Sequence, residues 1–116
     1  MEQFTEIIDM YLLNHDLYES GKVELDCDYG ELIFFKGHPK MLTLFGIYIY
    51  PEYRQQGFCR NIIHYLIEKS KGRFKYILIE SVMSKILYEY LLRFRYENRK
   101  FKRIYGGFIY KIKNWK

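Results

Sequence analysis

The chain has little of what builds cross-linked, disordered or membrane-spanning proteins. Only two cysteines and two prolines occur among 116 residues. This scarcity excludes a disulfide scaffold, a four-cysteine zinc site and a proline-rich disordered segment. No apolar run approaches the ~20 residues of a membrane span, and the acidic N-terminus lacks the basic and apolar regions of a secretory signal. We therefore expect a reduced, cytoplasmic protein.

Apolar and aromatic residues are abundant instead, at 49% and 20% of the chain, as a packed core requires. The length predicts a single domain over residues 1–116. Charge is unevenly divided: residues 1–50 carry a net −6 and residues 51–116 a net +11. This division suggests that the two halves meet different partners, and the alternative is a variation of solvated surface. The many Lys, Ile and Tyr residues are typical of an AT-rich genome, such as a viral one.

Hydrophobic patterning predicts nine elements in the order α-β-β-β-α-β-α-β-β. Apolar residues spaced three and four apart predict helices over residues 3–19, 58–71 and 84–94. Alternating or continuous apolar runs predict strands over residues 22–29, 32–36, 41–50, 76–82, 100–105 and 108–113, with turns at Gly30-Glu31 and Gly106-Gly107. The helix between the third and fourth strands requires a parallel pair. We expect an α/β (α+β) fold with a mixed, mostly antiparallel sheet, one parallel pair and flanking helices.

The stretch most informative about chemistry is IYIYPEYRQQGFCRNIIHYLIEK, residues 47–69. An apolar strand ends at Pro51, and a polar loop containing Gly57 leads into a helix. A helix N-terminus carries unpaired N–H groups and the positive end of the helix dipole, so such a loop can bind a phosphate. Arg54 and Arg60 add positive charge. An ordinary entry into a helix is the alternative interpretation of the loop by itself.

The complete pattern resembles motif A of the GNAT superfamily of N-acetyltransferases, in which an apolar strand leads into Pro-x-Tyr-Arg and Arg/Gln-x-x-Gly-x-Gly/Ala. Pro51, Tyr53, Arg54 and Gly57 match this motif, and Cys59 replaces the last Gly or Ala. The resemblance implies a GNAT-like fold over about residues 22–113 and acetyl-coenzyme A as co-substrate. The implied coenzyme ligands are the main chain of Ile47 and Ile49 for the pantetheine arm, and Arg54, Gln55, Gln56, Gly57, Phe58, Cys59 and Arg60 for the pyrophosphate.

A second match lies downstream, where Ser81-x-x-Ser84-x-x-x-Tyr88 is similar to the family's Asn-x-x-Ala-x-x-x-Tyr. The resemblance implies that Tyr88 protonates the departing coenzyme A thiolate, and that Ser81 contacts the pantetheine in place of Asn. A phenol is chemically suited to this proton transfer. The alternative for Tyr88 is a role in the core, because an aromatic residue at helical spacing usually packs.

In the implied reaction a primary amine attacks the thioester directly. A backbone N–H of Tyr48 or Ile49 is the expected oxyanion donor. The candidate bases are Glu24, Asp26, Asp28, Glu31 and Glu80. Three of these, Glu24, Asp26 and Asp28, are predicted to share one strand face and to attract a cationic acceptor, with an ordinary exposed polar face as the alternative.

The remaining polar candidates have simpler interpretations. His15, His38 and His64 lack metal-ligand spacing, so we expect no metal and structural roles. Cys27 lies on the apolar side of its predicted strand. Cys59, at a helix N-terminus, could have a lowered thiol pKa, although the reaction needs no acyl-cysteine.

Residues 93–103, RFRYENRKFKR, interleave six cations with three aromatic residues. This pattern is typical of single-stranded nucleic acid binding, of a site for an acidic protein, or of an edge strand protected by charge. The sequence therefore favours an acetyl-coenzyme A-dependent N-acetyltransferase with an unspecified amine acceptor. The alternative is a non-catalytic GNAT-fold module that binds nucleic acid or an acidic partner through its basic half.

Overall fold

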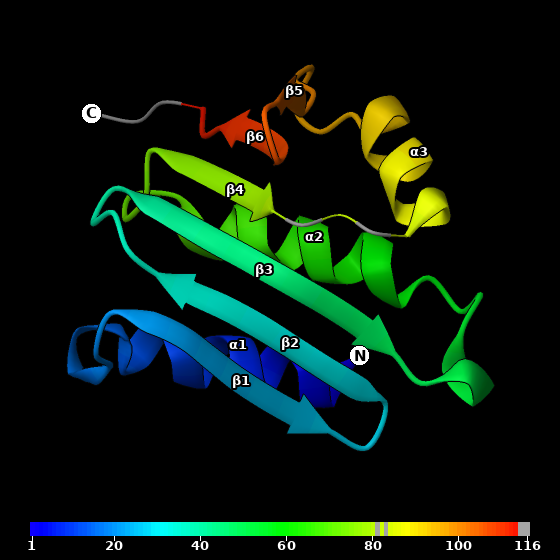
Figure 1. The fold of residues 1–116 in the computed structure, drawn as a ribbon, viewed down its shortest axis with the longest axis horizontal. Helices are drawn as coiled ribbons and strands as arrows, with labels where there is room; N and C mark the ends of the chain where they lie inside the picture. The colour runs from blue at the N-terminus through cyan, green and yellow to red at the C-terminus, as the bar shows by residue number, and fades with distance from the viewer. Residues whose placement is uncertain (81, 83, 114–116) are drawn as a thin grey trace.

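A computed structural model describes residues 1–80, 82 and 84–113 of the chain. Six strands form one sheet in the order β1-β2-β3-β4-β6-β5 (Figure 1). The elements are α1 (Glu2–Leu13), a 3-10 turn (His15–Leu17), β1 (Gly21–Cys27), β2 (Gly30–Lys36), β3 (Met41–Ile49), a 3-10 turn (Pro51–Tyr53), α2 (Phe58–Ser70), β4 (Tyr76–Glu80), α3 (Lys85–Arg93), β5 (Lys102–Ile104) and β6 (Gly107–Lys111). Only β3 and β4 pair in parallel among the described strands. The predicted fold class and element order are confirmed.

The observed element ends differ from the predicted ones most clearly at the first helix and at the two hairpin turns. The first helix ends at Leu13 rather than at residue 19, and a 3-10 turn follows it. Cys27 pairs with Gly30, so the first hairpin turn is Asp28-Tyr29 and the prediction of Gly30-Glu31 was wrong. In the last hairpin Ile104 pairs with Gly107, so the turn is Tyr105-Gly106, one residue earlier than the predicted Gly106-Gly107. Gly30 is needed for another reason: a side chain there would collide with the carbonyl oxygen of Tyr48.

Helices α1 and α2 cover the same face of the sheet, and Figure 1 shows both of them behind it. They are joined by a hydrogen bond in which Tyr65 Oη donates to Asp9 Oδ1 at 2.7 Å. The strand residues that face these helices form the buried core, and they include Leu32, Phe34, Leu42, Leu44, Ile77, Ile79, Phe108 and Tyr110. Burying each large apolar side chain stabilises the fold by about 1.5–3 kcal/mol. This core fixes the register of β3 against its neighbours, on which the candidate site depends.

Helix α3 follows β4 and packs near the end of the sheet formed by β6 and β5. Its N-cap, Ser84, accepts a hydrogen bond from the Leu87 N–H at 3.3 Å, and Leu91 on its inner side is fully buried. The apolar residues spaced three and four apart that predicted this helix therefore lie on the face that it presents to the core, as the buried Leu91 shows. Within the described residues, no helix combines the length and apolar character needed to cross a membrane.

Candidate functional site

Strand β3 has two halves with different neighbours. Residues Met41–Leu44 pair with β2 on one side and with Tyr76–Ile79 of β4 on the other. Beyond Leu44 the pairing with β4 stops, while β3 continues to Ile49 along β2. In the part of the chain that the structure describes, residues 45–49 thus form a strand segment bonded on one side only. We call residues 45–49 the free half of β3.

A β-bulge marks the boundary between the two halves. Ile33 of β2 pairs with Gly46, but the next residue, Phe34, pairs with Leu44, so Phe45 is an extra residue in β3. A bulge reverses which residues of a strand turn their backbone groups toward a given neighbour. Before it, Lys40 O accepts from Tyr76 N–H on the β4 side at 3.2 Å. This bulge could not be predicted, because the apolar pattern of the strand continues unchanged through residue 45.

The hydrogen bonds at the end of β3 establish the direction of its backbone groups. Tyr50 N–H donates to Tyr29 O at 2.9 Å, toward β2. By alternation, the N–H and C=O groups of Ile49 and Ile47 point away from β2, to the side where β4 has ended. The predicted use of the Ile47 and Ile49 main chain therefore has the required geometry. Of the two expected oxyanion donors, Ile49 N–H faces the open side and Tyr48 N–H faces β2.

The loop after β3 carries the features predicted for an anion site. Gly57 is the N-cap of α2 with φ of 79°, a left-handed conformation that favours glycine, and no side chain caps the helix there. Gln55 also has a positive φ, of 63°. Arg54, Gln55, Gln56, Gly57 and Arg60 are all exposed. Two exposed arginines therefore lie on either side of the start of α2, where no side chain caps the N–H groups of the first turn.

Aromatic packing holds both ends of this loop. The Tyr29 ring, in the β1–β2 turn, lies 4.7 Å from the Tyr53 ring and 5.5 Å from the Phe58 ring. Phe58 also packs edge-on against Phe4 of α1 at 5.4 Å. The Phe58 side chain is thus part of the support of the loop.

The environment of Cys59 contradicts the expected lowering of its pKa. The thiol is half-buried in the first turn of α2, and burial raises its pKa despite the nearby Arg54 charge. Tyr90 of α3 lies close enough to the same turn for the charges of Arg60 and Cys59 to act on the pKa of its hydroxyl. Burial raises the pKa of Tyr90 to about 12. The small, neutral Cys59 therefore fits a packed helix start rather than a reactive thiolate.

Tyr88 lies on the side of α3 that faces β6 and β5. Its ring packs edge-on against Phe108 at 5.2 Å, and the Arg103 guanidinium lies 5.8 Å from its centre. The ring is half-buried. The role predicted for Tyr88 remains a prediction. Ser81, the other residue of this second motif, lies outside the described residues.

The three predicted acceptor residues do not stay together. Glu24 and Asp26 are exposed on the outer face of β1, but Asp28 belongs to the turn. Gln3 of α1 donates to Asp28 Oδ2 at 3.1 Å and accepts from its N–H at 2.9 Å. This turn residue is therefore tied to the helical side of the sheet. The prediction that Asp28 shares a face with Glu24 and Asp26 was wrong, because β1 ends one residue before it.

Other side chains join the outer acidic face instead. Asp26 lies opposite Glu31 of β2, and Glu31 lies opposite Tyr48 in the free half. Partial burial, and then the charges of Asp26 and Glu31, raise the pKa of Tyr50. The carboxylates of Asp26 and Glu31 thus lie beside two tyrosines, Tyr48 in the free half of β3 and Tyr50 directly after it. Strand alternation could have identified this grouping once the pairing register was known.

The structure changes the interpretation of residues 93–103. Phe94 and Phe101 are each only 4% exposed, and Tyr96 is half-buried with the Lys71 ammonium 5.7 Å from its ring. The Phe94 and Phe101 side chains are therefore packed inward and are not available to stack on bases. The segment leads into the exposed edge strand β5, so its cations fit the protection of an edge.

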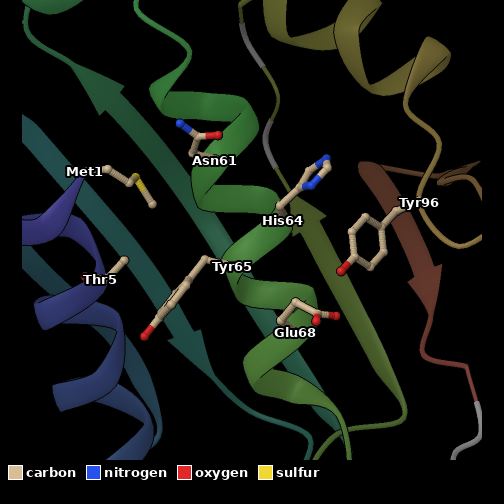
Figure 2. Close-up of a pocket in the computed structure, with 7 residues that line it drawn as sticks. All are labelled: Met1, Thr5, Asn61, His64, Tyr65, Glu68 and Tyr96. Atoms are coloured by element: carbon tan, nitrogen blue, oxygen red, sulfur yellow. The ribbon is translucent and has the colours of Figure 1, made fainter.

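A shallow groove of about 350 Å³ lies elsewhere, between α1, α2 and Tyr96 (Figure 2). It is lined by Met1, Thr5, Asn61, His64, Tyr65, Glu68 and Tyr96. Lys71 ties its rim by ion pairs to Glu68 at 2.6 Å and Glu97 at 2.9 Å. Burial, and then the Arg60 charge, lower the pKa of His64, so this side chain is neutral at pH 7. Among the described residues no cluster of three or more His, Cys, Asp and Glu side chains could hold a metal ion.

Two solved structures resemble this arrangement. A protein of Exiguobacterium sp. 255-15, described as a "putative acetyltransferase", has a TM-score of 0.52 at 12% identity over 90% of this chain and 74% of its own. A protein of Agrobacterium tumefaciens, described in the same words, has a TM-score of 0.47 at 18% identity over 94% and 88%. No protein-family model and no curated protein matches the chain in sequence. The first likeness shows a GNAT-type fold, as the two sequence motifs implied.

Proposed function

We propose that this protein is an N-acetyltransferase that moves the acetyl group of acetyl-coenzyme A to a primary amine by direct attack. One observation carries the proposal: the free half of β3 ends at a loop whose N–H groups and guanidinium groups suit a pyrophosphate. An extended ligand with amide groups can pair with the free half as an added strand. The two binding requirements of coenzyme A, amide pairing and anion binding, are thus met by adjacent backbone.

The residues fit the coenzyme in three respects. The main chain of Ile47 and Ile49 would pair with the pantetheine amides. The N–H groups of residues 55–60 would hold the pyrophosphate, with Arg54 and Arg60 supplying charge. The space around Gly57 is open to this approach, since among the described residues the only atom within 4 Å of a Cβ built there is Asn61 Nδ2, at 3.9 Å.

In the reaction a C–N bond forms to the acetyl carbon and its C–S bond breaks. The amine loses a proton to a base and the thiolate leaving group gains one. Ile49 N–H, on the open side of β3, would donate to the developing oxyanion. Tyr88 is our candidate proton donor to the thiolate.

The acceptor would approach over the outer face of the sheet. Glu24, Asp26 and Glu31 make this face negative next to the free half, which favours a cationic amine. Glu80 is the best-placed candidate base, because it ends β4 directly after the last β3–β4 pair, Leu44–Ile79. Glu80→Gln should lower kcat by about 100-fold or more, with an unchanged coenzyme dissociation constant, if Glu80 accepts the proton.

A thermal-shift titration with acetyl-coenzyme A tests the proposal directly. Ligand at ~100 times its dissociation constant should stabilise the fold by about 2.7 kcal/mol. Desulfo-coenzyme A, which keeps the phosphates and the arm, should stabilise the protein similarly, whereas adenosine should not. No shift at millimolar acetyl-coenzyme A would refute the proposal.

Mutation of the proton donor separates chemistry from binding. Tyr88→Phe should lower kcat by about 100-fold or more, in the range found for general acids, with an unchanged coenzyme dissociation constant. Tyr90→Phe is the matched control on the same helix and should retain kcat. Equal rates for Tyr88→Phe and the wild type would remove Tyr88 from the mechanism.

A further inference from the structure

Arg54 connects the two parts of the proposed coenzyme site. Its Nε–H donates to Ile49 O at 2.8 Å, and its guanidinium carbon lies 5.3 Å from the centre of the Tyr48 ring. Within the described residues, no carboxylate lies within 4.0 Å of this guanidinium. The cation is therefore held by a neutral carbonyl and an aromatic ring, and its charge is uncompensated.

This contact occupies a group that the pantetheine arm needs. Ile49 O is on the side of β3 where β4 has ended, and an added strand must use that same side. A carbonyl oxygen has two lone pairs, but the guanidinium stands at the edge itself, between the Ile49 carbonyl and open solvent. Arg54 therefore covers the end of the free half while this hydrogen bond lasts.

The same side chain is adjacent to the anion loop. Arg54 begins the loop, three residues before the N-cap Gly57. A guanidinium binds a phosphate group through paired, charge-assisted hydrogen bonds, which are stronger than one bond to a neutral carbonyl. A pyrophosphate at the loop would thus compete with Ile49 O for Arg54.

We propose that Arg54 is a positioning residue that couples anion binding to pantetheine binding. With no anion at the loop, Arg54 bonds Ile49 O and covers the free half. With a pyrophosphate at the loop, it turns to the anion and releases Ile49 O to accept from a pantetheine amide. The inference rests on the proposed function and deepens it, since it makes the phosphates of the coenzyme a condition for seating the thiol arm.

The test measures the two parts of the ligand separately, by NMR titration of the isotope-labelled protein. Pantetheine is titrated without and with saturating inorganic pyrophosphate. In the wild type, pyrophosphate should raise the affinity for pantetheine by about tenfold, a typical coupling between two sites. Pyrophosphate alone should also shift the Ile49 carbonyl carbon resonance, because Arg54 leaves that oxygen.

Two substitutions separate the open and closed conditions. Arg54→Ala leaves Ile49 O uncovered, so pantetheine should bind with an affinity that pyrophosphate no longer changes. Arg54→Gln places an amide N–H at the same number of bonds from the backbone as the arginine Nε, but without charge. This variant should keep Ile49 O covered and bind pantetheine weakly with or without pyrophosphate.

Arg60→Ala is the matched control, since it also removes one exposed arginine next to the loop. It should weaken pyrophosphate binding yet retain the tenfold coupling once the anion is saturating. An Arg54→Ala protein that retains wild-type coupling and the pyrophosphate-dependent Ile49 shift would overturn the role of Arg54. Failure of the wild type to bind intact coenzyme A at millimolar concentration would instead overturn the proposed function.

Discussion

The two halves of β3 are alike in sequence and different in their surroundings. Met41–Leu44 and the free half are both apolar, yet the first is bonded on two sides and the second on one. The first half therefore contributes to stability, and the second leaves backbone N–H and C=O groups for another molecule. An interior strand that loses one neighbour part of the way along its length provides a binding edge without exposing a whole edge strand.

The largest expected effect is on the doubly paired half. Leu44 is 1% exposed, so Leu44→Ala should lower the free energy of unfolding by about 2–5 kcal/mol through lost contacts and a cavity. Tyr48 lies in the free half and is 46% exposed. Tyr48→Ala should therefore lower the free energy of unfolding by less than about 1 kcal/mol. Urea denaturation of both variants measures the difference. Equal losses would mean that the two halves contribute alike to stability.

Amide hydrogen exchange compares the backbone hydrogen bonding of the two halves of β3. The amides of Leu42 and Leu44 lie in a doubly paired ladder and should exchange only on large-scale opening. Those of Ile47 and Ile49 should exchange at least about 100-fold faster, and acetyl-coenzyme A should slow them. Exchange followed by NMR at each residue measures both effects. Strong protection of Ile47 and Ile49 without ligand would contradict an open edge.

Alkylation of Cys59 reports on the loop beside the free half. Burial raises the pKa of this thiol, and only the thiolate reacts. The iodoacetamide rate should therefore stay low near neutral pH and increase as the pH rises above the usual thiol range. Acetyl-coenzyme A should slow it by about a further tenfold, as expected for a ligand that covers a site nine-tenths of the time. A Cys27→Ser variant isolates Cys59, and Cys59→Ala isolates Cys27, whose rate the ligand should leave unchanged.

The smallest effect is expected at the edge strand β5. With Phe94 and Phe101 buried, we expect only weak, salt-sensitive binding of single-stranded oligonucleotides. Lys100→Glu combined with Lys102→Glu should leave acetyl-coenzyme A affinity within about twofold, because these exposed residues lie on or next to β5 rather than at the loop. Fluorescence anisotropy measures the oligonucleotide affinity between about 50 and 200 mM salt, a range over which contacts to phosphate weaken strongly. Tight binding abolished by these charge swaps would support the non-catalytic alternative.

Much of the site was predictable because its parts are local. Pro51, Tyr53, Arg54 and Gly57 lie within one stretch of seven residues, and a loop before a helix exposes N–H groups in any fold that contains it. The parallel pairing of the flanking strands followed from the helix between them. The direction of the Ile47 and Ile49 backbone groups was not predictable in this way, because the bulge at Phe45 reverses the alternation and leaves no mark on the hydrophobic pattern.

Other errors share that cause. Asp28 was assigned to the outer face with Asp26 because the sequence alternates through both residues, but the pairing of Cys27 with Gly30 puts Asp28 in the turn. The two-residue turn places Glu31, rather than Asp28, next to Asp26 on the outer face. Likewise, the sequence pattern around Phe94 and Phe101 is typical of aromatic residues that stack on bases, but both side chains are buried in the core.

The sequence by itself determined the order of the elements, the parallel pair and the polar loop with Gly57 before α2, since each depends on periodicity or on neighbouring residues. Only the tertiary structure decided where β4 stops beside β3, which backbone groups the bulge turns outward, and that Arg54 reaches back to Ile49 O. These features depend on register between segments far apart in the chain. A register is the outcome of packing the whole core, and no local pattern encodes it.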